Sequence, residues 1–173
     1  RIIAESTNEE ERLGYYEIVE SNNERLLQLI NEILDLSKIE SGIVEFTITP
    51  VRLHPLCKEI HDAHIFRCPK GVELIYEPSD ENIVIDGDKN RIFQVISNLI
   101  GNAFKFTPAG YISYGYHREG KYVAFHVTDT GMGIAPDKVD RIFERFVKVN
   151  NFAQGTGLGL SICKTIIERL GGN

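Results

Sequence analysis

The stretch DKNRIFQVISNLIGNAFKF, residues 88–106, has the pattern of an amphipathic helix with two distinct faces. At 100° per residue, its apolar side chains share one face and several polar ones fall along a neighbouring line. The apolar face holds Ile92, Val95, Ile96, Leu99, Ala103 and Phe106, and the polar line holds Arg91, Gln94, Asn98, Asn102 and Lys105. Asp88 is suited to accept hydrogen bonds from the first free N–H groups of a helix. The stretch therefore predicts a helix over 89–106 with Asp88 as its N-cap.

The polar line of this helix has a composition that suits a ligand. Asparagine is a mediocre helix former because its amide competes for backbone hydrogen bonds, yet Asn98 and Asn102 stand one turn apart. An asparagine carbonyl is a hard oxygen ligand suited to Mg²⁺, and Lys105 supplies a positive charge for phosphate. A solvated polar face is the alternative interpretation.

Strand and helix patterns alternate around this helix and predict an α+β fold. Strands are expected at 44–49, 72–77 and 82–86, helices at 53–66 and 160–170, and a hairpin at 111–117 and 121–129. Interleaved helices favour parallel strands, whereas the hairpin requires antiparallel pairing. We therefore expect a two-layer α/β sandwich with a mixed sheet.

Residues 1–43 have the pattern of a long helix that precedes this sandwich. Thr7 and Glu10 form a possible capping box, and Ser41-Gly42 is a plausible helix end. The apolar stripe is wider than a two-stranded coiled coil requires, which favours a four-helix bundle formed with a partner. Packing of this helix against its own domain is the alternative. The stripe comprises Tyr15, Val19, Leu26, Leu27, Leu29, Ile30, Ile33, Leu34 and Leu36.

The motif TDTGMGI, residues 128–134, places Asp129 where the second hairpin strand ends in a glycine turn. An ionised carboxylate only accepts hydrogen bonds, so it suits a donor such as the exocyclic amine of adenine. Gly131 and Gly133 let the backbone pass close to a flat base. An aspartic protease would need a second such motif and leaves the asparagines unexplained, whereas a plain turn with a solvated aspartate remains an alternative.

The stretch QGTGLGLSI, residues 154–162, has glycine at every second position directly before the last predicted helix. The spacing fits neither the Walker loop nor the dinucleotide-binding fingerprint. A hinge, a tight turn and a phosphate-binding helix start are all compatible with it, since the first N–H groups of a helix attract anions.

Together, the ordered motifs resemble the ATP-binding domain of sensor histidine kinases. NLIGNAFKFTPAG (98–110) is similar to the N box of that family, DTGMGI (129–134) to its G1 box, IFERF (142–146) to its F box and GTGLGLSI (155–162) to its G2 box. LLQLINEILDLSKIESG (26–42) resembles the second helix of the dimerisation and phosphotransfer domain. The resemblance implies a Bergerat ATP-binding fold preceded by a bundle-forming helix.

The resemblance also implies domains, cofactors and site residues. Residues 1–43 would form part of the dimerisation domain, namely the end of its first helix and its second helix, and 44–173 the catalytic ATP-binding domain without its last strands. ATP and Mg²⁺ would bind there, with Asn102 on Mg²⁺, Asp129 on adenine, and Arg145 or Lys148 of a mobile lid (135–154) near the γ-phosphate. Phe143 and Phe146 of the lid would dock on the protein when nucleotide is bound. The other implied ATP-binding residues are Asn98, Lys105, Phe106, Gly131, Gly133, Ile134, Gly155, Thr156, Gly157, Leu158, Gly159 and Leu160.

The chain departs from the family pattern in its histidines. The family phosphorylates a histidine on the first dimerisation helix, and no histidine here has that sequence context. We therefore expect nucleotide binding without autophosphorylation by this chain, which we expect to be part of a longer polypeptide. The implied partners are a second copy, through residues 1–43, and a response-regulator receiver domain. Another ATPase of the same superfamily, an inactive signalling module and a purely helical interaction domain are the alternatives.

The bulk composition excludes several classes of partner. A net charge of −6 argues against nucleic acid and anionic membranes, and no apolar run is long enough to span a bilayer. Three widely spaced cysteines favour a reducing compartment, which we expect to be the cytoplasm. Four zinc-type residues between 57 and 68 would share one face of a helix, but one helix cannot bring all four to a single ion, so we interpret them as packing residues. They are Cys57, His61, His64 and Cys68.

Overall fold

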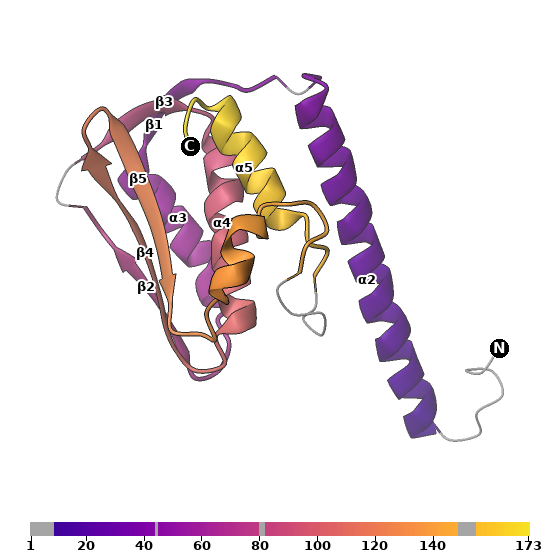
Figure 1. Cartoon of the computed structure of the whole chain (residues 1–173). Coiled ribbons are helices and arrows are strands. Elements are labelled where there is room, and N and C mark those ends of the chain that lie inside the picture. The colour runs from indigo at the N-terminus through magenta and orange to yellow at the C-terminus, as the bar shows by residue number, and fades with distance from the viewer. Residues whose placement is uncertain (1–8, 44, 80–81, 149–154) are drawn as a thin grey trace.

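Helix α4 (Lys89–Phe106) lies in the middle of the molecule (Figure 1). The strands and α3 (Leu53–Ile65) pack against it from one side, and α5 (Gly159–Arg169) packs against it from the other. The computed structural model describes residues 9–43, 45–79, 82–148 and 155–173. Helix α2 (Glu9–Glu40) runs beside α5 and extends well beyond the rest of the molecule. The capping box predicted at Thr7 and the end of a first helix predicted in residues 1–8 lie outside the described residues.

The N-terminus of α4 is fixed by the side chain that the sequence indicates. The Asp88 carboxylate accepts hydrogen bonds from the N–H groups of Asn90 at 2.9 Å and Arg91 at 3.1 Å. It also accepts one from the Thr47 N–H at 2.9 Å, which joins the preceding loop to the helix. Asp88 is buried, so these bonds compensate a carboxylate that has lost most of its water.

The strands form two small sheets rather than one. β2 (Val72–Glu77) pairs in parallel with β4 (Gly110–Glu119), and β4 pairs antiparallel with β5 (Tyr122–Asp129). β1 (Thr49–Arg52) and β3 (Val84–Gly87) form a separate antiparallel pair. The three-stranded sheet is mixed, as predicted, and the two-layer α+β arrangement is confirmed.

The strand predicted over 44–49 is wrong in its position. Residue 44 lies outside the described part of the chain, residues 45–48 are not in a strand, and β1 begins only at Thr49. The backbone of Thr47 donates to the Asp88 side chain instead of to a neighbouring strand, so this segment is held by a helix cap. Of the described residues in this segment only Phe46 is half-buried, whereas Glu45, Thr47, Ile48 and Thr49 are exposed.

Two hydrophobic clusters hold the layers together. The sheet-side core packs α3 and one face of α4 against the strands, and it includes Leu53, Leu56, Ile60, Leu74, Ile92, Ile96, Ile100, Ile112 and Tyr114. The α5-side core packs α5 against an adjoining part of the apolar face of α4 and against the end of α2, and it consists of Leu36, Ile39, Val95, Leu158, Ile162, Cys163 and Ile166. α4 therefore contributes apolar side chains to both cores.

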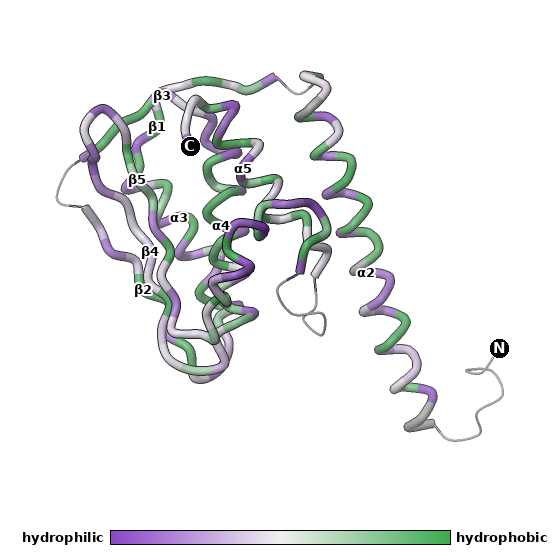
Figure 2. Tube along the Cα trace, in the orientation of Figure 1, coloured by the Kyte–Doolittle hydropathy of each residue, from purple (hydrophilic) through white to green (hydrophobic). Residues whose placement is uncertain are grey.

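Among the described residues, the rest of the chain covers only the last part of α2. Leu36 and Ile39 are buried in the α5-side core, whereas most of the predicted apolar stripe is exposed. Figure 2 shows apolar residues along α2 well away from α5. The helix ends at Glu40, and Gly42 follows with φ of +72°, the left-handed conformation that glycine adopts at helix ends. The helix thus folds back on its own domain at one end, and the described parts of the chain leave a long apolar face of it exposed.

The four zinc-type residues have separate neighbours. Cys57 is buried in the sheet-side core, and the Cys68 thiol donates to the Val72 carbonyl at 3.2 Å. His61 stacks against Tyr114 at 6.5 Å between ring centroids, while the Nδ1 of His64 lies 2.9 Å from the Ile60 carbonyl.

No helix within the described ranges combines the length and the apolar character needed to cross a membrane.

Candidate functional site

Helix α4 and the glycine-rich start of α5 are joined by two of the predicted site residues. The Asn98 side-chain amide donates to the Gly159 carbonyl at 3.1 Å. Further along the same face of α4, the Lys105 ammonium lies close to Gly155: a Cβ added to Gly155 would be 2.5 Å from the Lys105 Nζ. The polar line of α4 therefore runs alongside the glycine-rich segment, as a shared ligand site requires. Asn102 is half-buried on the same line, one turn from each of them.

The turn after β5 lies against the C-terminal end of α4. The Gly131 N–H donates to the Asp129 carboxylate at 2.8 Å, and the Met132 N–H donates to the Phe106 carbonyl at 3.2 Å. A Cβ on Gly131 would collide with that carbonyl, so only glycine permits this approach. The bond to Gly131 uses one oxygen of Asp129, and the exposed side chain can accept a further donor.

Thr130 anchors this turn to the neighbouring strand. Its hydroxyl accepts from the Tyr111 N–H at 3.0 Å and donates to the Tyr111 carbonyl at 3.2 Å. Because Tyr111 lies at the start of β4, the position of Asp129 is tied to two strands of the sheet.

Glycine is required twice in the segment before α5. Gly155 and Gly157 have φ of +138° and +79°, values that other residues rarely adopt. A Cβ on Gly157 would lie 2.9 Å from the backbone of Phe146, whose N–H donates to the Gly157 carbonyl at 2.9 Å. α5 begins at Gly159 without a side-chain cap, so its first N–H groups depend on other partners.

These groups fit a nucleotide with its metal ion. Glycines whose Cβ positions are already filled by Lys105 and Asn98 form a tight cradle beside a helix N-terminus, the usual environment for phosphate. Asn102 offers an amide oxygen of the type that Mg²⁺ accepts, and Asp129 offers an acceptor to a base amine. Neutral amides and one lysine suit an anionic ligand better than a cationic one.

The structure brings most, but not all, of the predicted residues together. Contacts join Asn98 with Gly159, Lys105 with Gly155, and Phe106 with Gly131, whose N–H is bonded to Asp129. Gly157 contacts Phe146 of the predicted lid. Leu158 is buried in the α5-side core, so only its backbone can face a ligand. Leu160 is half-buried in the first turn of α5, and Gly133 and Ile134 lie further along the exposed loop.

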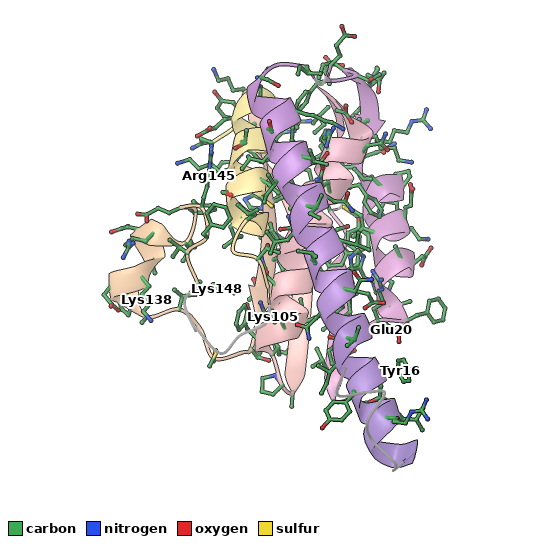
Figure 3. The ribbon with its side chains drawn as sticks, turned by 90° about the vertical axis from the view of Figure 1, so that its right-hand side faces the viewer. Tyr16, Glu20, Lys105, Lys138, Arg145 and Lys148 are labelled. Carbon is green, nitrogen blue, oxygen red and sulfur yellow. The ribbon has the colours of Figure 1, made fainter. Side chains whose placement is uncertain are left out.

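The predicted lid begins with a short 3-10 helix, η1 (Pro136–Arg141). Figure 3 shows Lys138, Arg145 and Lys148 along the lid, to one side of Lys105. Phe143 and Phe146 are both exposed, at 44% and 61%. Residues 149–154 of the predicted lid lie outside the described residues, and the γ-phosphate role of Arg145 or Lys148 stays a prediction.

Sequence reasoning missed two acidic residues of α2 that contact this region. The Thr156 hydroxyl donates to the Glu32 carboxylate, and the Gln94 amide donates to Asp35 at 3.1 Å. Arg91 also forms an ion pair with Asp35 at 3.6 Å. The first half of the polar line on α4 therefore contacts α2, and only its second half reaches the glycine-rich segment. The sequence signal that could have indicated these contacts is the acidic pair three residues apart between the apolar residues Leu29 and Leu36.

A groove of about 520 Å³ runs along another side of α4, between α2 and α3. Of the predicted site residues, only Asn98 lines it. Its other lining residues on α4 are Phe93, Gln94, Ser97, Gly101 and Phe104. The groove therefore does not coincide with the site formed by Lys105, Asp129 and the glycines.

Comparison with known families gives a match to one family model. Residues 87–173 match the model described as histidine kinase-, DNA gyrase B- and HSP90-like ATPase. The matched residues include α4, the turn after β5 and the start of α5, where the site residues lie.

Curated relatives are sensor kinases. The chain is 34% identical over 185 aligned positions to the autoinducer 2 sensor kinase/phosphatase LuxQ of Vibrio harveyi, covering 100% of the chain and 22% of LuxQ. It is 39% identical over 158 positions to the sensor histidine kinase RcsC of Escherichia coli, covering 86% of the chain and 16% of RcsC. The chain therefore spans about a fifth of the length of these relatives.

Solved structures give the same result. Full-length ShkA in complex with AMPPNP matches with a TM-score of 0.81 and 31% identity, over 99% of this chain and 36% of ShkA. The histidine kinase ThkA in complex with the response regulator TrrA matches with a TM-score of 0.77 and 27% identity, over 96% of this chain and 47% of that one. The chain thus belongs to the family of histidine kinase-, DNA gyrase B- and HSP90-like ATPases, and its relatives within that family are sensor histidine kinases.

Proposed function

We propose that this chain binds Mg-ATP and serves as the ATP-binding kinase module of a sensor histidine kinase. The observation that carries the proposal is the convergence on α4, where Asn98 bonds Gly159 and Lys105 lies against Gly155. One helix thereby joins a predicted metal ligand, a phosphate-binding lysine and a glycine-rich helix start. The AMPPNP complex of ShkA supports the choice of nucleotide.

Each group of the site has a role in binding the nucleotide. Asp129 accepts a hydrogen bond from the adenine amine, and Gly131 keeps that carboxylate in place. Lys105 and the backbone of 155–160 bind the phosphates, and Asn102 holds Mg²⁺. The metal supplies charge neutralisation to the phosphate oxygens. Arg145 or Lys148 of the lid provides a further positive charge.

The reaction requires mainly that this chain position the γ-phosphoryl group. A histidine nitrogen forms a bond to phosphorus while the bond between phosphorus and the bridging oxygen of ADP breaks. All five histidines of this chain lie in α3 and the β4–β5 hairpin, and none has the family sequence around a phosphoacceptor. We therefore place the acceptor on another segment of the full-length protein, and the chain alone should incorporate no γ-phosphate.

The next acceptor is an aspartate of a response-regulator receiver domain. The complex of ThkA with a response regulator supports this class of partner. The reaction draws on cytoplasmic ATP, so we place this module in the cytoplasm.

Titration calorimetry with Mg-ADP tests the proposed site. Asp129→Asn should weaken binding about tenfold or more, because the amide replaces an acceptor with a donor in front of the adenine amine. The matched control is Asp62→Asn, which removes the same charge from an exposed position on α3 and should leave affinity unchanged. Absence of binding by the unmodified chain, or equal affinity of both variants, would contradict the proposal.

We further propose that residues 1–43 form part of a dimerisation domain and 44–173 the ATP-binding domain. The exposed apolar face of α2 supports an intermolecular four-helix bundle, since Leu26, Ile30 and Ile33 are 43–56% exposed. Replacing these three residues by serine should shift sedimentation equilibrium of the full-length protein from dimer to monomer. Unchanged dimerisation would contradict this assignment.

A further inference from the structure

Glu32 extends from α2 to the glycine-rich segment that the proposed function assigns to phosphate. Its carboxylate accepts the hydrogen bond of the Thr156 hydroxyl. The same hydroxyl oxygen accepts from the Leu158 N–H at 3.2 Å. An acidic side chain of the neighbouring helix thus binds directly to the phosphate cradle.

Three other contacts hold α2 at this place. Asp35 accepts from Gln94 at 3.1 Å and pairs with Arg91 at 3.6 Å, both on α4. The Arg169 guanidinium of α5 donates to the Ile39 carbonyl at 2.6 Å, at the end of α2. Because these contacts lie on successive turns of one rigid helix, the position of Glu32 is set by the docking of α2 as a whole.

The cradle uses several of its own hydrogen-bond donors in this arrangement. The Thr156 hydroxyl is bonded to Glu32, the Leu158 N–H to Thr156, and the Asn98 amide to Gly159. A phosphate group must replace such internal partners before it gains hydrogen bonds of its own. Glu32 differs from the other partners because it also carries a negative charge.

We propose that Glu32 competes with the nucleotide phosphates for Thr156, so that α2 docking and nucleotide binding oppose each other. The proposal rests on the proposed function of the site. Thr156 has one proton to donate, and a carboxylate beside a bound polyphosphate is repelled by it. Thermodynamic linkage makes the effect reciprocal: nucleotide loosens α2 to the same extent that docked α2 weakens nucleotide.

The affinity for Mg-ADP of the unmodified chain and two Glu32 variants tests this competition. Glu32→Gln removes the charge and keeps an acceptor for Thr156, whereas Glu32→Ala removes both. We expect Kd to fall about threefold for the glutamine variant and about tenfold for the alanine variant, the range for one partly solvated charge and one hydrogen bond. Addition of salt should reduce the difference between the glutamine variant and the unmodified chain.

Glu20→Gln is the matched control. Glu20 is exposed on the same helix about 18 Å from Glu32 at 1.5 Å per residue, and Figure 3 shows it beside Tyr16 on the part of α2 that extends beyond α5. This variant removes the same charge without a contact to Thr156. Its Kd for Mg-ADP should equal that of the unmodified chain.

Hydrogen exchange of the amides in residues 29–39 provides the reciprocal measurement. Mg-ADP should accelerate their exchange in the unmodified chain and have little effect in Glu32→Ala. Equal or weaker nucleotide affinity in both Glu32 variants, or slower exchange of α2 with nucleotide, overturns the competition while leaving the proposed function intact. If neither the unmodified chain nor any of the variants binds Mg-ADP, the proposed function itself fails.

Discussion

Asp88 is the residue on which the position of α4 depends. It is 7% exposed and accepts three backbone N–H groups, two from the first turn of α4 and one from Thr47. Asp88→Ala leaves these donors without a partner and should lower the free energy of unfolding by about 2–3 kcal/mol. Urea denaturation measures this, with the exposed Asp86→Ala as control. A loss below about 0.5 kcal/mol would show that water replaces the carboxylate.

Gly155 combines a constrained backbone with a close neighbour. Its φ is +138°, and a Cβ would lie 2.5 Å from the Lys105 ammonium. Gly155→Ala should therefore displace Lys105 and weaken Mg-ADP binding about tenfold. Gly120→Ala is the control, because Gly120 has φ of +60° in the hairpin turn and no atom of the described residues lies within 4 Å of its Cβ position. The control should lose stability but keep nucleotide affinity; an equal loss of affinity in both would assign the effect to general strain.

At the scale of elements, α2 is held by a short apolar stripe near its end. Ile39 is 0% exposed in the α5-side core, whereas Ile30 is 45% exposed on the same helix. Ile39→Ala should reduce the free energy of unfolding by about 2–4 kcal/mol, and Ile30→Ala by less than about 1 kcal/mol. Urea denaturation followed by circular dichroism compares them. Similar losses would mean that the two faces of α2 are equally buried in solution.

The sequence predicted elements wherever one local signal determined them. α4 follows from its apolar period and from Asp88, and the hairpin from two alternating runs around a glycine turn. The position of β1 was mispredicted because the Thr47 N–H bonds a side chain that lies 41 residues later. Asn98, Asn102 and Lys105 on the polar line of α4 were predicted to bind a ligand, whereas the contacts of Gln94 and Arg91 with Asp35 were not predicted. Such pairings depend on how two helices pack, which periodicity does not specify.

At the scale of the whole molecule, two buried thiols and a buried tyrosine hydroxyl make the free energy of unfolding sensitive to high pH. Burial raises the pKa of the Cys57 and Cys163 thiols to about 11 each, and it also raises the pKa of Tyr114. Well below pH 9, the ordinary pKa of a thiol, these groups are protonated in both states, so their contribution to stability is fully present. As pH rises from 9 towards 11, the unfolded chain ionises first and the free energy of unfolding should fall.

Urea denaturation at a series of pH values measures this fall. The double variant Cys57→Ala and Cys163→Ala is less stable at neutral pH because of its cavities, but its stability should decline less steeply above pH 9. An equally steep decline in the variant would assign the effect to other groups.

The two apolar stripes of α2 have a geometric consequence. The stripe that faces α5 holds Leu36 and Ile39, and the exposed stripe with Ile30 and Ile33 is displaced from it by about 120° around the helix. The polar contacts of Glu32 and Asp35 are made from the side of the helix that packs on the ATP-binding domain. Apolar packing and polar contacts therefore select the same rotational setting of α2. A partner helix can contact the exposed stripe without any rotation of α2.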